Sequence, residues 1–284
     1  MLWEPTWISD LKTLFELIYL SFTAPRMDEE AYASFENRMK AQLKNLELNP
    51  MVAFSDSLTK AIYNNNPRAM RIDPADFKNI SYPRIMEMYK ERFGDASGFV
   101  FTFVGNIDTD SIRPLVEQYL ATLPANGKIE QGNPKEVPAI RKGDYVNRFK
   151  RQMETPKASV VNFYSGQMDY NLENIVTATM LKQVLDLIYT EKVREDEGGT
   201  YGVQTSARIS SFPEGQTFLQ AYFDTDPDKR EKMNTIVRNE LKRISDIGPT
   251  PEDFKKTQDN IMMHLVFSKG YLFFPAVRRR TVTG

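Results

Sequence analysis

Residues 192–203 read KVREDEGGTYGV, a short charged stretch with paired glycines between a long apolar helix pattern and an alternating strand pattern. The turn expected here brings Arg194 and Tyr201, seven positions apart, to the same end of a helix and a strand. A guanidinium and a phenol hydroxyl are both donors that can reach a peptide carbonyl or an oxyanion. In a structural role, Arg194 would instead cap the helix C-terminus and Tyr201 would pack. Spacing alone favours the structural role.

The patterns around this turn predict a sheet covered by helices. The preceding helix, from about Leu172 to Arg194, has apolar positions over more than half of its circumference, which favours burial against a sheet. The following strand, Thr200 to Ser210, alternates, with Tyr201, Val203, Thr205, Ala207 and Ile209 on one face. The neighbouring elements expected are strands at Tyr145–Arg151, Ala158–Tyr164 and Thr217–Asp224, a hairpin loop at Phe212–Gly215, a helix containing Met233 to Ile244, and a last helix from Pro251 towards Lys269.

The first part of the chain reads as helices followed by one strand and one helix. Four helices are expected, over about residues 7–21, 28–46 and 50–62 and from Tyr82–Pro83 onward. GFVFTFVG (Gly98–Gly105) is β-rich, apolar and bounded by glycines, which predicts a buried strand. A helix from Ser111 to about Thr122 follows it.

Gly, Pro, Lys and Glu are frequent between Gly127 and Gly143, which indicates a linker. We therefore expect three segments: a partial αβ domain over 1–126, a linker over 127–143, and a second partial αβ domain over 144–284. The order strand-strand-helix-strand-strand-helix in the second segment predicts the α+β class, with mainly antiparallel sheets.

The turn resembles the Arg-Glu-x-x-Gly-x-x-Tyr-x-Val signature of the pitrilysin/insulinase family of zinc peptidases, the inverzincins, with Arg194 and Tyr201 at the matching positions. The stretch FVGNIDTDSIRPLVEQYLATLP (residues 103–124) is also similar to that family. The resemblance covers about residues 7 to 265. It implies two domains of the pitrilysin type, the third and fourth of the family, both incomplete here.

The resemblance also implies a function. In that family the signature lies in the C-terminal, non-catalytic half, where the arginine and tyrosine contact substrate. It therefore implies that Arg194 and Tyr201 are substrate-binding residues, that this chain has no catalytic residue, and that zinc is held by a missing catalytic half. That half would be on the same polypeptide or a partner chain, and the substrate would be a peptide.

Histidine and cysteine counts restrict metal chemistry. The chain has one histidine, His264, and no cysteine. Zinc peptidases of this class use two histidines and a glutamate on or near one helix, so no complete site of that kind is expected. His264 stands in the apolar run IMMHLVF (Ile261–Phe267), which favours a core or boundary position.

Composition restricts the other classes of partner. Lys and Arg number 37 and Asp and Glu 38, for a net charge of −1, so no global basic field attracts nucleic acid or anionic lipid. No apolar run is long enough to span a membrane, and the N-terminal residues lack the pattern of a signal peptide. The absence of cysteine fits either cytoplasm or periplasm.

Two alternatives to a peptidase half remain open. Some members of the family have no chemistry and serve as structural or binding subunits of the same fold, although retention of Arg194 and Tyr201 favours the peptidase. A free-standing domain with an unrelated binding role is the third possibility. A His-x-x-Glu-His helix upstream or on a partner chain would decide for the peptidase.

Overall fold

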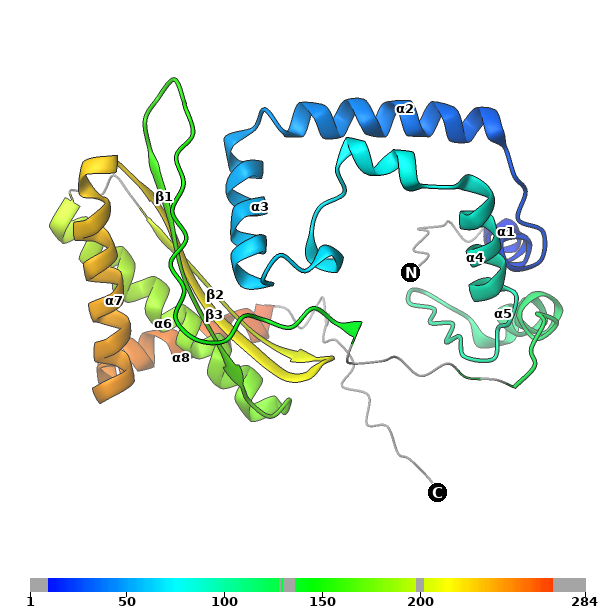
Figure 1. The fold of residues 1–284 in the computed structure, drawn as a ribbon. Helices are drawn as coiled ribbons and strands as arrows, with labels where there is room; N and C mark the ends of the chain where they lie inside the picture. The colour runs from blue at the N-terminus through cyan, green and yellow to red at the C-terminus, as the bar shows by residue number, and fades with distance from the viewer. Residues whose placement is uncertain (1–9, 128, 130–135, 198–201, 268–284) are drawn as a thin grey trace. The chain divides into compact units, whose positions relative to one another are not determined.

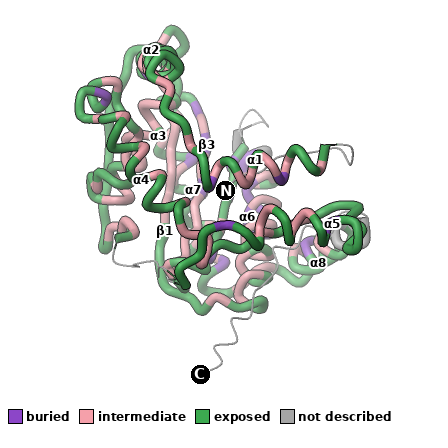
Figure 2. The backbone as a smooth tube through the Cα atoms, turned by 90° about the vertical axis from the view of Figure 1, so that its right-hand side faces the viewer, coloured by how far each residue is buried: buried purple, intermediate pink, exposed green. Residues whose placement is uncertain are grey.

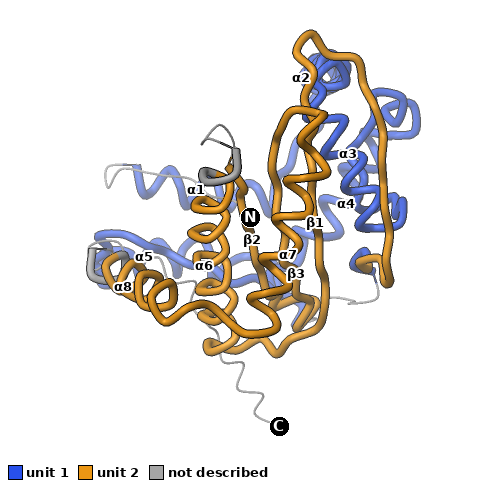
Figure 3. The backbone as a smooth tube through the Cα atoms, turned by 90° about the vertical axis from the view of Figure 1, so that its left-hand side faces the viewer, with its two compact units in different colours: residues 1–138 blue, residues 139–284 orange. Residues whose placement is uncertain are grey.

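The computed structural model describes residues 10–127, 129, 136–197 and 202–267, with the backbone alone for residues 194–197 and 264–267. It divides into unit 1, residues 1–138, and unit 2, residues 139–284 (Figure 3). The division falls inside the stretch expected to be a linker. Within the described part, no helix is long and apolar enough to cross a membrane.

Unit 1 is built from helices over its described residues (Figure 1). The Asp28 side chain caps one of them by accepting a hydrogen bond from the Ala31 N–H at 2.9 Å, and Asn49 does the same for Met51. The elements are α1 (Leu11–Thr23), α2 (Glu29–Leu46), α3 (Pro50–Ile62), η2 (Pro67–Ala69), η3 (Pro74–Asn79), α4 (Tyr82–Phe93), α5 (Thr109–Leu115) and η4 (Val116–Leu120).

Aromatic side chains form the centre of unit 1. Phe15 and Phe22 of α1 are buried, at 0% and 5% exposed. Figure 2 colours buried residues along the backbone purple. Two tyrosine hydroxyls fasten the helices together: Tyr89 of α4 donates to the Ser21 carbonyl at 2.8 Å, and Tyr119 donates to Glu16 at 3.1 Å. Edge-to-face and stacked rings contribute about 0.5–1.5 kcal/mol per pair beyond the area they bury.

The prediction of a strand at Gly98–Gly105 is wrong for the described structure. The segment has no assigned strand, although Phe99 and Phe101 pack on Phe22 and Phe103 packs on Phe15 of α1, as the alternation predicts. It belongs to no sheet, because a ladder needs a neighbouring strand and the described residues of unit 1 contain none.

The helix predicted at Ser111–Thr122 is present but changes character in its middle. α5 begins after Asp108, whose carboxylate caps it, and gives way at Val116 to one π-helical turn, η4. Pro114 lies inside α5 and has no N–H to donate, which interrupts the regular ladder there.

Unit 2 contains a three-stranded antiparallel sheet in the order β1-β3-β2. The strands are β1 (Ala158–Gln167), β2 (Val203–Ser211) and β3 (Glu214–Thr225), so the central strand is the last in sequence. β2 and β3 form the predicted hairpin, with Ser211 opposite Glu214, and Val203 pairs with Phe223 at the other end. Gly215 in this hairpin has φ +77°, and an added Cβ would lie 2.8 Å from the Met168 carbonyl oxygen.

Two helices, α6 (Leu172–Glu197) and α7 (Arg230–Ile247), pack on one face of the sheet. In Figure 3 both lie in front of the strands, and α8 (Pro251–Phe267) lies next to α6. A short turn, η6 (Pro227–Lys229), precedes α7. The core between them is formed by Val184, Leu185, Ile188, Tyr189, Val193, Val203, Ala221, Phe223, Met233, Val237 and Ile244. This arrangement confirms the predicted α+β class.

Two predictions for unit 2 need correction. Tyr145–Arg151 is not a strand: Tyr145 is 53% exposed and its ring lies 3.9 Å from the Arg141 guanidinium, so no apolar face holds the segment on the sheet. The apolar surface of α6 is also not buried along its whole length. Its C-terminal half enters the core, whereas Leu172 is 64% and Val176 43% exposed.

Candidate substrate-binding turn between α6 and β2

A buried valine lies on each side of the connection from α6 to β2. Val193 in the last turns of α6 is 0% exposed, and Val203 at the start of β2 is 6% exposed. Both belong to one apolar cluster with Phe223 of the central strand. The two ends of the connection are therefore fixed, and the nine residues between Val193 and Val203 begin and end at the same core.

Arg194 and Tyr201, the residues predicted to bind substrate, both lie inside this interval. Arg194 directly follows the buried Val193 in the backbone of α6. The Arg194 side chain and the whole of Tyr201 lie outside the described residues. Their assignment as substrate-binding residues therefore stays a prediction, as does the position of the His264 side chain in α8.

Asp186 fastens α6 to β2 close to this turn. Its Oδ1 accepts a hydrogen bond from the Thr205 backbone N–H at 2.9 Å, and its Oδ2 accepts one from Lys182 Nζ at 2.6 Å. Thr205 is the third residue of β2, so this carboxylate satisfies a strand N–H just after the turn. The sequence analysis did not identify Asp186. The only sequence signal for it is that Asp186 is an acidic residue between Leu185 and Leu187 in an apolar stretch of the helix.

Tyr189 lies one turn further along α6 and is fully buried. Its hydroxyl donates to the Val237 carbonyl of α7 at 3.1 Å, which joins the two helices over the sheet. Burial raises the pKa of the Tyr189 phenol far above its ordinary value. The hydroxyl is therefore a permanent donor with a structural partner, and it is not a candidate for acid–base chemistry.

A second polar cluster lies at the β1–β3 end of the sheet and is centred on Asp224. The Asp224 carboxylate accepts hydrogen bonds from Lys157 Nζ at 2.9 Å, from the Tyr222 hydroxyl at 2.8 Å and from the Ser159 hydroxyl. Burial opposes the charged form, but these three donors outweigh it and lower the pKa of Asp224. The cluster joins two strands at paired positions, since Ser159 is opposite Asp224 in the ladder.

The described residues do not fit a metal centre. Among them, no group of three or more His, Cys, Asp or Glu side chains could hold an ion. Asp224, Asp226 and Asp228 have the sequence spacing of the first three ligands of an EF-hand calcium loop. The Asp224 carboxylate, however, already accepts hydrogen bonds from Lys157, Ser159 and Tyr222. Zinc was expected on the missing catalytic half, and that expectation stays a prediction.

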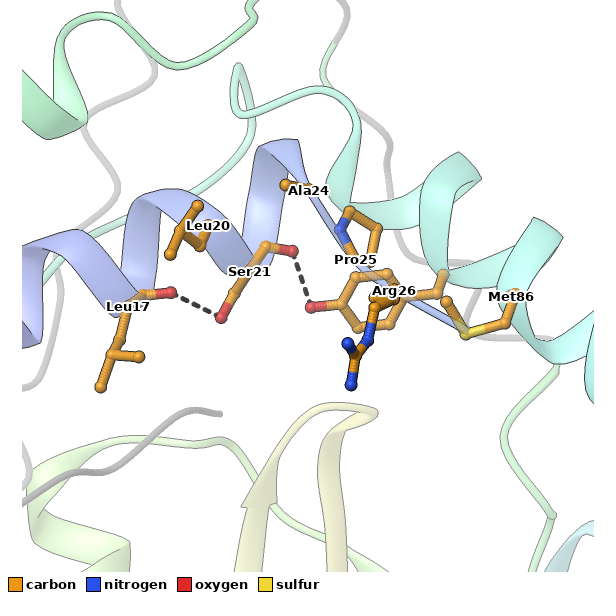
Figure 4. Close-up of a pocket in the computed structure, with 8 residues that line it drawn as sticks. Leu17, Leu20, Ser21, Ala24, Pro25, Arg26 and Met86 are labelled. Atoms are coloured by element: carbon orange, nitrogen blue, oxygen red, sulfur yellow. Dashed lines mark hydrogen bonds between the residues drawn. The ribbon is translucent and has the colours of Figure 1, made fainter. Parts of the chain in front are cut away.

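Two hollows in the described part of the chain offer alternative sites. Figure 4 shows the first, of about 370 Å³, which is lined by residues of α1 and α4, among them Leu17 and Met86, and in which the Tyr89 hydroxyl already donates to the Ser21 carbonyl. The second, of about 790 Å³, lies on α7 over Leu219 and contains the bonded pair Lys242–Asp246. Among the described residues of either hollow, no hydroxyl is hydrogen-bonded to a His, Asp or Glu side chain, so neither hollow indicates catalysis by an activated nucleophile.

The structure thus defines a class: an α+β protein whose described residues hold no metal site and whose candidate binding residues lie on a turn anchored at both ends. The family model "Peptidase M16 inactive domain" matches residues 79–261. The chain belongs to this family, which confirms the resemblance to inverzincin zinc peptidases and to their non-catalytic half.

Relatives with solved structures or curated descriptions agree with this assignment. The "Zinc protease PQQL-like" of Arabidopsis thaliana is 22% identical over 262 residues, covering 87% of this chain and 27% of its own length. A mutant of the ferredoxin protease FusC, solved in complex with Arabidopsis ferredoxin, shares the fold with a TM-score of 0.72 at 16% identity, covering 93% of this chain and 28% of that one.

A further solved structure is the peptidase M16 inactive domain from Pseudomonas fluorescens. It shares the fold with a TM-score of 0.67 at 19% identity, and the match covers 90% of this chain and 61% of that chain. The chain therefore spans about a quarter of the length of the curated relative and under two thirds of this single inactive domain.

Proposed function

We propose that this chain is the non-catalytic half of a zinc-dependent metalloendopeptidase, and that it binds and encloses peptide substrate. The observation that carries the proposal is the match of the inactive-domain family model to residues 79–261, which includes the turn at 192–203. The isolated chain is expected to have no turnover. The catalytic half, on the same polypeptide or on a partner chain, would supply the zinc.

The chemistry of the turn supports a role in substrate binding. Hydrolysis of a peptide bond builds negative charge on the carbonyl oxygen, and donors fixed near that oxygen stabilise it. The guanidinium of Arg194 and the hydroxyl of Tyr201 are donors of that kind. The turn lies between two buried residues, Val193 at 0% and Val203 at 6% exposed, which belong to the same core.

Complementation between the two halves tests the proposal. Hydrolysis of an unstructured protein substrate is measured for this chain alone, for the His-x-x-Glu-His half alone, and for both in one polypeptide or one mixture. Cleavage should appear only when both halves are present and should disappear with a zinc chelator. Turnover by this chain alone would contradict the proposal. A stable complex of the two halves without cleavage would indicate the structural-subunit alternative.

A further inference from the structure

The segment that leads into β1, residues 139–157, concentrates positive charge. Six of its nineteen residues are basic and two, Asp144 and Glu154, are acidic, so the segment has a net charge of +4 in a chain of net charge −1. The basic residues are Arg141, Lys142, Arg148, Lys150, Arg151 and Lys157. A local excess of one sign creates a potential that attracts partners of the opposite sign, even where the whole chain is nearly neutral.

Most of this segment is exposed and precedes β1 without forming a helix or a strand (Figure 1). Lys142, Arg148 and Lys150 are exposed, and within the described residues none of them forms an ion pair or a side-chain hydrogen bond. These three are called the unpaired cations below. Lys157, by contrast, binds Asp224 at 2.9 Å. Half of the basic residues of the segment therefore have no neutralising acid in the described part of the chain.

Apolar side chains are exposed between these cations. Val146 is 74%, Tyr145 53% and Phe149 47% exposed. The segment has two aromatic rings, and the Arg141 guanidinium lies 3.9 Å from the centroid of one of them, Tyr145. Proteins that bind single-stranded nucleic acid stack successive bases on free aromatic rings. With one of its two rings already covered by a cation, this surface fits a partner with carboxylates and apolar side chains better.

We propose that residues 139–157 bind acidic polypeptide, and that they select acidic segments among the peptide substrates of the complete peptidase. The inference rests on the proposed function, because it names the substrate class that this half retains. Carboxylates of the substrate bind the unpaired cations, and its apolar side chains contact Val146 and Phe149. Hydrogen bonds between such cations and carboxylates are about twice as strong as neutral ones. Because the groups are exposed, binding depends strongly on salt.

Binding of a fluorescent peptide to this chain, measured by anisotropy, tests the proposal without any hydrolysis. The probe is an unstructured peptide rich in glutamate and leucine. Its controls are the same peptide with glutamine in place of glutamate and a single-stranded oligonucleotide of equal charge. The acidic peptide should bind at least about 10-fold more tightly than the glutamine peptide, and at least about 10-fold more weakly at 300 mM than at 50 mM salt. Equal affinity for the two peptides, or tighter binding of the oligonucleotide, would overturn the proposal.

Two double charge reversals assign the binding to this segment. Arg148→Glu with Lys150→Glu should lower the affinity for the acidic peptide by at least about 10-fold. Lys255→Glu with Lys256→Glu on α8 is the matched control, because it changes the net charge equally at two exposed cations. The control should change the affinity by less than about 3-fold. An equal loss in both double variants would overturn the assignment to residues 139–157, since net charge alone would then explain the binding.

The same variants separate this inference from the proposed function. In the protein that contains both halves, Arg148→Glu with Lys150→Glu should raise KM for an acidic substrate by at least about 3-fold and leave kcat unchanged, because the segment holds no reacting group. If no protein hydrolyses peptide while this chain still prefers the acidic probe, the proposed function alone fails. If hydrolysis is normal but this chain binds both peptides equally, the present inference alone is overturned.

Discussion

Replacement of Asp186 by alanine should destabilise unit 2 at the start of β2. The substitution leaves the Thr205 N–H without its 2.9 Å acceptor and Lys182 without its 2.6 Å partner. A hydrogen bond to a charged group contributes about 1.5–3 kcal/mol. The Asp186 side chain is 32% exposed, so solvent compensates part of the loss. We expect a cost of about 1–2 kcal/mol, which corresponds to a fall in Tm of about 2–8 °C for a unit of this size.

The chain offers a matched control in Asp246. It forms the same i,i+4 pair with Lys242 at 2.7 Å, but no strand N–H is bonded to it among the described residues. Asp246→Ala should therefore cost no more than about 0.5 kcal/mol, as exposed helix pairs do. Thermal and urea unfolding followed by circular dichroism measure both variants. Equal destabilisation by the two substitutions would refute the assignment of Asp186 as the carboxylate that fastens β2 to α6.

Three further predictions concern metal, boundary and pH. After dialysis the isolated chain should retain no stoichiometric zinc, and elemental analysis showing one zinc per chain would disagree. Limited proteolysis should cut first within 127–143, whereas first cleavage inside Leu172–Arg194 would contradict the linker. Because folding lowers the pKa of Asp224, its stabilisation is present above the ordinary aspartate pKa and is lost as pH falls through the lowered value. The stability difference between wild type and Asp224→Asn should therefore shrink in acid, and a difference unchanged down to pH ~2 would contradict this account.

The helices of both units were predictable from local sequence. Pro50 and Pro83 stand at first helical turns, and Asp28 is an N-cap, so the starts of α2, α3 and α4 were found to within one or two residues. The hairpin at Phe212–Gly215 was likewise determined by local turn chemistry. In each case the residues that specify the element lie within it.

Pairing and long-range contacts were not predictable in the same way. GFVFTFVG has strand composition, but the hydrogen bonds of a strand depend on a partner elsewhere in the chain, and the described residues supply none. Asp186 and Asp224 take their importance from Thr205 and Ser159, which are 19 and 65 residues away in sequence. The spacing of residues in the sequence does not predict these contacts. The substrate-binding role of Arg194 and Tyr201 came from family resemblance and has yet to be tested.

The most direct measurement is the kinetics of Tyr201→Phe in the protein that contains both halves. If the hydroxyl acts as a donor in the transition state, kcat should fall by about 100-fold while KM changes little, as expected when one oxyanion donor is lost. Tyr164→Phe is the control, because Tyr164 lies on β1 and is 41% exposed. It should leave both constants unchanged. A Tyr201→Phe enzyme with wild-type kcat would contradict the account and return Tyr201 to a packing role.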